Sequence, residues 1–172
     1  MKIFFLCTIL LLTLTVSLAA QNKSIYTSTS DKICKAQKAN DDEGGDYIGI
    51  CPGVGGYKLK LIEGDLRQTL FVITPKKKEH PLRFNEFYYS FSAIGDKVEW
   101  RTKRGVPFAL IARYNVADVE NSEKRTSYLM VVKITKSFSC VTDVVLPGAK
   151  QNEEARKLAD TASTRACKVA GQ

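Results

Sequence analysis

The sequence is short of the side chains on which much enzyme chemistry depends. It contains one histidine, His80, among 172 residues, so any catalytic pair or general base built on imidazole would have to use this residue. His80 lies in the run KKKEHPL, whose lysines and proline predict an exposed loop in which neighbouring positive charge keeps the imidazole neutral. The G-x-S-x-G motif of serine hydrolases is absent. We therefore expect a surface histidine without a catalytic role.

Phosphate-binding glycine motifs are absent as well. The run CPGVGGYKLKL, residues 51–61, brings Gly53, Gly55 and Gly56 close together. A phosphate loop has the pattern G-x-x-x-x-G-K-[ST], and a dinucleotide site has G-x-G-x-x-G between a strand and a helix. The residues after Gly56 instead alternate between apolar and charged side chains, as in a strand. These glycines indicate a tight turn into a strand, and no nucleotide is expected.

Carboxylate chemistry and metal binding have little support in the spacing of the acidic residues. Two carboxylates could act without histidine, but nothing in the sequence links any two of the candidates. The candidates are Glu63, Asp65, Glu86, Glu99 and Asp143. An acidic run could bind calcium, but the twelfth position from Asn40 is Cys51, where a calcium-binding EF-hand loop has glutamate. The run contains Asp41, Asp42, Glu43 and Asp46. A solvated loop is favoured, and neither a metal nor a cofactor is expected.

The first residues have the pattern of a secretory signal peptide. In MKIFFLCTILLLTLTVSLAAQ a single lysine precedes an apolar run that ends in small residues. Ser17 and Ala19 suit cleavage before Ala20. The alternative, a retained membrane anchor, is disfavoured because about 16 apolar-rich residues are fewer than the ~20 that span a bilayer. We expect a signal peptide over 1–19 and one exported domain over 20–172, without a transmembrane segment, in the periplasm or secreted.

Removal of the signal peptide would leave an even number of cysteines. Four remain after Cys7 is lost: Cys34, Cys51, Cys140 and Cys167. In an exported chain this count indicates two disulfides, and three pairings are possible. Short local loops favour Cys34–Cys51 and Cys140–Cys167. The competing reading, a zinc site, would need close Cys-x-x-Cys pairs, which the sequence lacks.

The hydrophobic pattern predicts an α+β fold. We expect a mostly antiparallel sheet of six or seven strands with a short N-terminal helix and a C-terminal helix. The clearest element is a hairpin over residues 57–74, and an aromatic-rich strand follows within 82–91. Further strands are expected at 97–102, 107–116, 127–135 and 138–146.

Two helices complete this expected fold. A cap at Ser30 or Asp31 would start the N-terminal helix, which would run to about Lys38. Asn152 is the expected N-cap of the C-terminal helix, with Cys167 at the helix end, so that a disulfide ties the helix to the strand that carries Cys140. A stripe of apolar residues recurs at helical spacing over Ala155, Leu158, Ala159, Ala162 and Ala166.

The positive charge of the chain is the strongest indication of a function. The formal net charge is +8, which becomes about +7 without Lys2, and such a surface attracts polyanions, anionic lipid headgroups or acidic proteins. The basic residues cluster in predicted connections or strand ends, which would form a positive rim if two of these loops share an end of the sheet. The predicted binding residues are Lys76, Lys77, Lys78, Arg101, Lys103, Arg104, Lys124 and Arg125. The competing reading is that these charges only aid solubility.

Several runs of the sequence resemble uncharacterised exported proteins of bacteria. They include CPGVGGYKL, EHPLRF, FSAIGDKVEWR, PFALIARYNV, SYLMVVKIT and NEEARKLAD, which together span most of the chain after the signal peptide. The resemblance implies a location in the bacterial envelope or outside the cell, and it brings no assigned activity and no catalytic residues.

The sequence favours a non-enzymatic binding or inhibitor-like module of the bacterial envelope or the secreted fraction. The expected partner is an anionic envelope component or an acidic protein. Two alternatives stay open at this point: a hydrolase that uses carboxylates alone, and a structural component of the envelope without a small ligand.

Overall fold

A computed structural model describes residues 21–37 and 47–169 of the chain. The predicted signal peptide and the acidic run of residues 40–46 lie outside the described residues. The elements in chain order are β1 (Lys23–Ser28), β2 (Lys35–Gln37), β3 (Tyr47–Pro52), β4 (Lys58–Gly64), β5 (Arg67–Ile73), β6 (Glu79–Pro81), the 3₁₀ helix η2 (Phe84–Glu86), β7 (Ser92–Lys103), β8 (Val106–Ala117), β9 (Arg125–Ile134), β10 (Ser139–Val145), α1 (Gln151–Asp160) and the 3₁₀ helix η3 (Ala162–Thr164).

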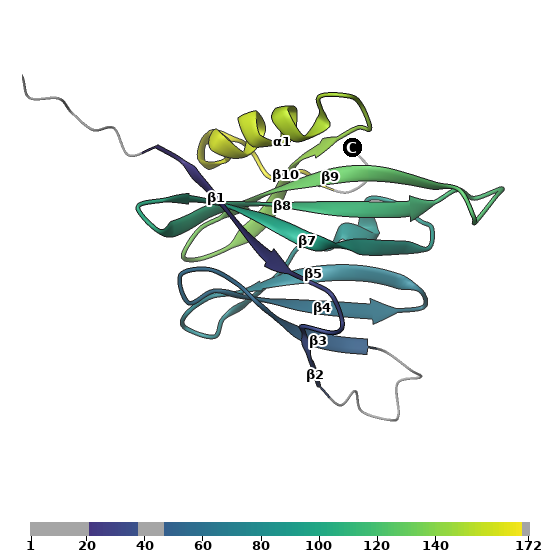
Figure 1. The fold of residues 1–172 in the computed structure, drawn as a ribbon, viewed down its shortest axis with the longest axis horizontal. Helices are drawn as coiled ribbons and strands as arrows, with labels where there is room; N and C mark the ends of the chain where they lie inside the picture. Colours follow the sequence, from purple (N-terminus) through teal and green to yellow (C-terminus); the bar gives the residue numbers. More distant parts are fainter. Residues whose placement is uncertain (1–20, 38–46, 170–172) are drawn as a thin grey trace, which may run out of the picture.

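All ten strands belong to one mixed sheet that divides into two halves. The order is β10-β9-β8-β7-β5-β4-β3-β2, with β1 beside β7 and β6 beside β5. Neighbouring strands are antiparallel except β5 and β7, which are parallel and pair only through Arg67 and Ser92. Because this single pair joins them, β1 and β7–β10 form one half of the sheet and β2–β6 form the other (Figure 1).

The main core lies between these two halves. Trp100 on β7 and Leu110 on β8 belong to the same buried cluster as Leu59 on β4 and Val72 on β5, and all four are 0% exposed. Alternate residues of β4 and β5 point inward, which is the period expected of a half-buried sheet, whereas β8 and β9 are buried on both faces. Each such side chain contributes about 1.5–3 kcal/mol by its burial.

A second, smaller core lies between the sheet and α1, which covers the opposite face of β8, β9 and β10 (Figure 1). Ala155 and Ala159 are fully buried against Ile111 and Val131. The C-terminal helix and the first part of its small-residue stripe are thus confirmed, although the helix begins at Gln151 and the cap position is Lys150 rather than Asn152. The helix ends at Asp160, before the last residues of the predicted stripe.

The α+β prediction is wrong, because the chain is mainly β with ten strands and a single α-helix in its described part. In place of the N-terminal helix, residues 31–34 form a turn and residues 35–37 form β2. Only one helical turn forms, in which the Cys34 amide donates to the Ser30 carbonyl at 2.9 Å. Ile33 in this turn is 57% exposed, so a longer helix would bury no apolar face here. Pairing of β1 with β7 and of β2 with β3 satisfies the backbone instead.

The expected strand within 82–91 is also wrong. Arg83 has a φ of 52°, in the left-handed region, which breaks the extended chain before η2. The break turns Phe84 into the main core, where it is 0% exposed and its ring packs edge-on against Tyr114. Phe84 therefore serves burial rather than strand pairing, whereas Tyr89 later in the segment is 89% exposed.

Other local predictions are confirmed. The hairpin of residues 57–74 forms as β4 and β5, and the glycines before it make a turn in which Gly55 and Gly56 have φ values of 61° and 82°. Both favoured disulfides, Cys34–Cys51 and Cys140–Cys167, are present. The second disulfide, however, joins β10 to an extended segment after η3 and not to the end of a helix, and the Lys168 amide donates to the Val141 carbonyl of β10 at 2.8 Å.

Candidate functional site

Four turns that are distant in the sequence meet at one end of the sheet. They lie at the left of Figure 1, opposite the loop between β8 and β9. Lys78 donates from Nζ to the Ser137 carbonyl at 3.1 Å, which links two of these turns. A Cβ atom on Gly55 would lie 3.0 Å from Pro107, which links the other two. The turns comprise residues 53–57, 74–78, 103–106 and 135–138.

This end of the sheet carries a concentration of exposed cations, which we call the basic end. Its members are Lys58, Lys76, Lys77, Lys78, Lys103, Arg104 and Lys136. Glu79, which directly follows Lys78, is the one carboxylate in these turns or directly beside them, and it forms an ion pair with Lys60 at 3.0 Å. The positive charge of the basic end is therefore not balanced by nearby acids.

Tight backbone geometry presents these cations from fixed positions. Arg104 and Gly105 have φ values of 52° and 77°, as in the two-residue type I′ turns that join antiparallel strands. Lys77 also has a positive φ, of 62°, and the Thr74 hydroxyl accepts a hydrogen bond from the Lys78 amide at 3.0 Å. The charged side chains thus extend from short turns whose backbone is fixed by hydrogen bonds.

Two apolar side chains are exposed among the cations. Val106 is 61% exposed and Phe138 is 44% exposed. The Lys133 ammonium lies 5.6 Å from the centre of the Phe138 ring, so the ring is held beside positive charge. The basic end combines cations with exposed apolar side chains, so it suits a binding partner whose surface has both negative charge and apolar groups.

The structure brings together only part of the predicted binding set. Lys76, Lys77, Lys78, Lys103 and Arg104 lie at the basic end. Lys124 lies in the turn between β8 and β9, and Arg125 is the first residue of β9, both at the opposite end of the sheet.

Arg101 is 8% exposed and forms two hydrogen bonds of 2.8 Å with Asp160, so its inclusion in an exposed rim was wrong. Lys58 and Lys136 also lie at the basic end, but they were not among the binding residues predicted from the sequence. Which turns meet is decided by the order of the strands in the sheet, and no local sequence pattern indicates that order.

His80 lies beneath the basic end and not on an exposed loop, so that prediction is wrong. It is part of β6 and 4% exposed, with Nδ1 at 3.2 Å from the Ser139 hydroxyl. Burial, together with the charge of Lys78, lowers the pKa of its imidazole. A serine beside a histidine resembles a nucleophile with its base, but Ser139 is 7% exposed. This pair is shut off from any substrate and serves the packing of β6.

The candidate carboxylates each engage a separate partner. Glu99 accepts hydrogen bonds from Ser24 and Arg156 at 2.5 and 2.9 Å. Burial alone would raise the pKa of Glu99, but these hydrogen bonds bring it below the ordinary value. A general acid needs the opposite shift. The other four are paired as Glu63 with Gln68, Asp65 with Arg67, Glu86 with Arg83, and Asp143 with Arg165.

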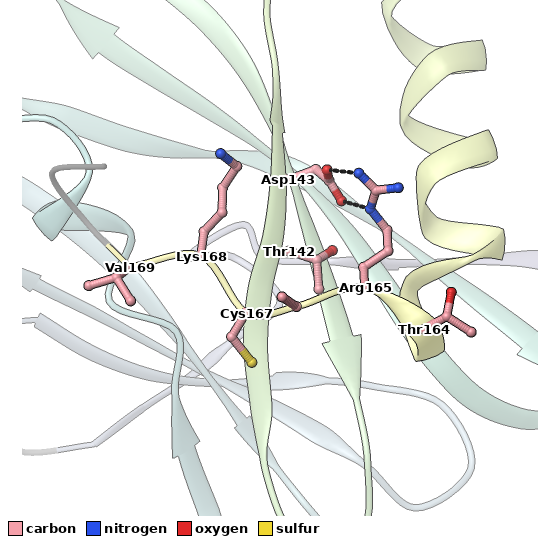
Figure 2. A pocket seen from close by; sticks show the side chains of 8 residues that line it. Thr142, Asp143, Thr164, Arg165, Cys167, Lys168 and Val169 are labelled. Atoms are coloured by element: carbon pink, nitrogen blue, oxygen red, sulfur yellow. Dashed lines mark hydrogen bonds and ion pairs between the residues drawn. The ribbon is translucent and has the colours of Figure 1, made fainter.

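An open hollow of about 540 Å³ adjoins the C-terminal disulfide (Figure 2). Arg165 and Asp143 face each other in it through two hydrogen bonds of 2.5 and 2.6 Å. These bonds raise the pKa of the Arg165 guanidinium. The two charges satisfy one another, and the other charged side chain of the hollow, Lys168, is exposed.

No family model, curated protein or solved structure matches this chain. Within residues 21–37 and 47–169, no helix is long and apolar enough to cross a membrane. The same residues contain no group of three or more potential metal ligands.

Proposed function

We propose that the protein is an exported, non-enzymatic binding module of a bacterial envelope, and that the basic end contacts an anionic envelope surface. The observation that supports this proposal is the gathering of cations from four turns around two exposed apolar side chains, Val106 and Phe138. Phosphate-bearing lipid headgroups offer negative charge above apolar chains, and each lysine or arginine near such a surface contributes about 1 kcal/mol.

Export is supported by the signal-like N-terminus and by the two disulfides, which persist in oxidising compartments. The buried His80 and the separately paired carboxylates give an enzymatic alternative no support.

Sedimentation with lipid vesicles tests this proposal. The mature, oxidised protein should bind vesicles that contain anionic phospholipid and should not bind purely zwitterionic vesicles. Binding should weaken as salt rises, because screening shortens the reach of exposed charges.

The double variant Lys76→Gln/Arg104→Gln should bind about 30-fold more weakly, since two charges contribute about 2 kcal/mol. Lys124→Gln/Arg125→Gln is the matched control, because it removes one lysine and one arginine at the opposite end of the sheet. Equal losses in the two variants would mean that net charge alone attracts the protein. If the protein does not bind vesicles but retains an acidic protein from an envelope extract, the partner of the basic end is a protein and not a lipid surface.

A further inference from the structure

A separate cavity lies on the outer face of the sheet, between α1 and β1. Its volume is about 310 Å³, and its lining includes Ile111 and Leu129 from adjacent strands. These two side chains are 5% and 3% exposed, which gives the cavity an apolar floor. Pockets for small ligands are mostly apolar with a few polar groups. This cavity is more polar, because six of its eight lining residues carry polar or charged groups, and its volume is at the small end of the usual range.

The acidic group of the cavity is already neutralised. The Arg156 guanidinium donates from Nε to both Glu99 oxygens, at 2.9 and 3.1 Å, and from Nη2 to the Tyr26 hydroxyl at 3.0 Å. Ser24 and Tyr26 add hydrogen bonds to the same carboxylate. Glu99 therefore has little capacity left to balance a further cation.

Arg113 faces this cavity and has no carboxylate partner among the described residues. Its guanidinium donates to the neutral Ser127 hydroxyl at 2.8 Å and to the side-chain carbonyls of Gln151 and Asn152 at 3.3 and 3.5 Å. The side chain is half-buried. Gly95 leaves room for it, because a Cβ atom there would lie 3.0 Å from the Arg113 Cβ. A half-buried guanidinium held only by neutral acceptors retains an uncompensated charge.

Lys97 adds a second uncompensated charge at the cavity. It is exposed, and its ammonium lies 5.8 Å from the centre of the Tyr26 ring. The three cations Lys97, Arg113 and Arg156, less the one carboxylate of Glu99, leave the cavity with a net charge of +2. This charge stands over an apolar floor.

We propose that this cavity binds a small organic anion, a carboxylate or phosphate monoester with a short apolar body. The anionic group would lie between Arg113 and Lys97, where a guanidinium and an ammonium both offer charge-assisted hydrogen bonds. The apolar body would lie on Ile111 and Leu129. The inference does not depend on the basic end, since its residues come from the outer face of the sheet and from α1.

Calorimetry with four probes tests the ligand class. Hexanoate and hexyl phosphate should bind, and comparison of the two shows which anionic group the site prefers. Hexanol, which has the apolar body without the charge, and inorganic phosphate, which has the charge without the body, should each bind at least tenfold more weakly. Hexanol binding as tightly as hexanoate, or inorganic phosphate as tightly as hexyl phosphate, would overturn the proposal.

Variants locate the binding within the molecule. Arg113→Gln should weaken the better probe at least tenfold, whereas Arg104→Gln, which removes an exposed arginine at the basic end, should not alter it. Lys97→Gln is the second variant, for use if Arg113→Gln does not fold. Because Lys97 is exposed, its replacement should leave the fold intact, and it should weaken binding about threefold. If Arg113→Gln folds and binds the probe with unchanged affinity, the site is rejected. If Arg113→Gln does not fold, unchanged affinity in Lys97→Gln rejects it.

The variant Lys76→Gln/Arg104→Gln should bind the probe with the affinity of the unmodified protein. It separates this site from the basic end, so that either proposal can fail while the other holds.

Discussion

His80 Nδ1 lies 3.2 Å from the Ser139 hydroxyl, and this contact joins β6 to β10, two strands that share no backbone pairing. The Lys78 ammonium reaches the Ser137 carbonyl beside it. The two halves of the sheet are thus fastened to each other at the basic end by side chains. His80 Nε2 is buried without a hydrogen-bond partner among the described residues, so the site suits a neutral imidazole and disfavours a charged one.

Acidification should therefore weaken the fold through His80. The pKa of this histidine is lowered in the folded state, chiefly by burial, whereas in the unfolded chain it is near 6.5. Below that pH the imidazole is protonated in the unfolded chain but stays neutral in the folded protein. The free energy of unfolding therefore decreases as the pH is lowered. Denaturant unfolding should show a loss of up to about 1.4 kcal/mol between pH 7.5 and 5.5.

Two variants assign this pH dependence. His80→Gln should flatten the slope between pH 7.5 and 5.5, because glutamine does not titrate. Ser139→Ala should lower stability at every pH but keep the slope, since the histidine stays buried. A slope that survives in His80→Gln would mean that another group is responsible.

The sequence predicted local structure better than it predicted the arrangement of distant segments. The alternation through residues 57–74 identified a hairpin, and short loops identified both disulfides, because these features depend on neighbours along the chain. The burial of His80 depends on strand order, which places β6 beside β5 and against β10. Its charged neighbours in the sequence gave the opposite indication.

The same limit applies to the basic residues. Lys103 and Arg101 are two positions apart on β7, but β1 and α1 cover Arg101, and Lys103 is exposed at the strand end. No composition or spacing distinguishes them. The tertiary contacts of Arg101 with Asp160, 59 residues away, decide the difference.

Loss of either disulfide should destabilise the protein by a different route. The loops span 17 and 27 residues, which correspond to about 3 and about 3.5 kcal/mol in the chain-entropy account. Cys140→Ala/Cys167→Ala should also release the extended segment over 165–169, which limited proteolysis would detect. Cys34→Ala/Cys51→Ala should leave that segment protected, and equal proteolysis in both variants would contradict the assignment.

Removal of the Glu99 charge should destabilise the outer face of the sheet. Glu99→Gln leaves Arg156 without its carboxylate, and we expect a loss of about 2 kcal/mol in unfolding free energy. Because the pKa of Glu99 is lowered in the folded state, its contribution is present above its unfolded value near 4.5 and is lost as the pH falls further. Glu120→Gln, at an exposed loop position, should change stability by less than about 0.5 kcal/mol.

Arg104 allows stability and binding to be separated at one position. At a φ of 52° a residue with a side chain loses about 1–2 kcal/mol of stability through strain. Glycine avoids this strain, but it loses more backbone entropy on folding, so the net gain in stability is smaller. Arg104→Gly should therefore raise the unfolding free energy by about 0.5–1 kcal/mol, while it weakens binding to anionic vesicles. Arg104→Val should weaken both, because a β-branched residue fits this φ poorly. If Arg104→Gly bound vesicles as tightly as the unmodified protein, the charge at this turn would have no part in binding, and the basic end would have to act through the lysines of its other turns.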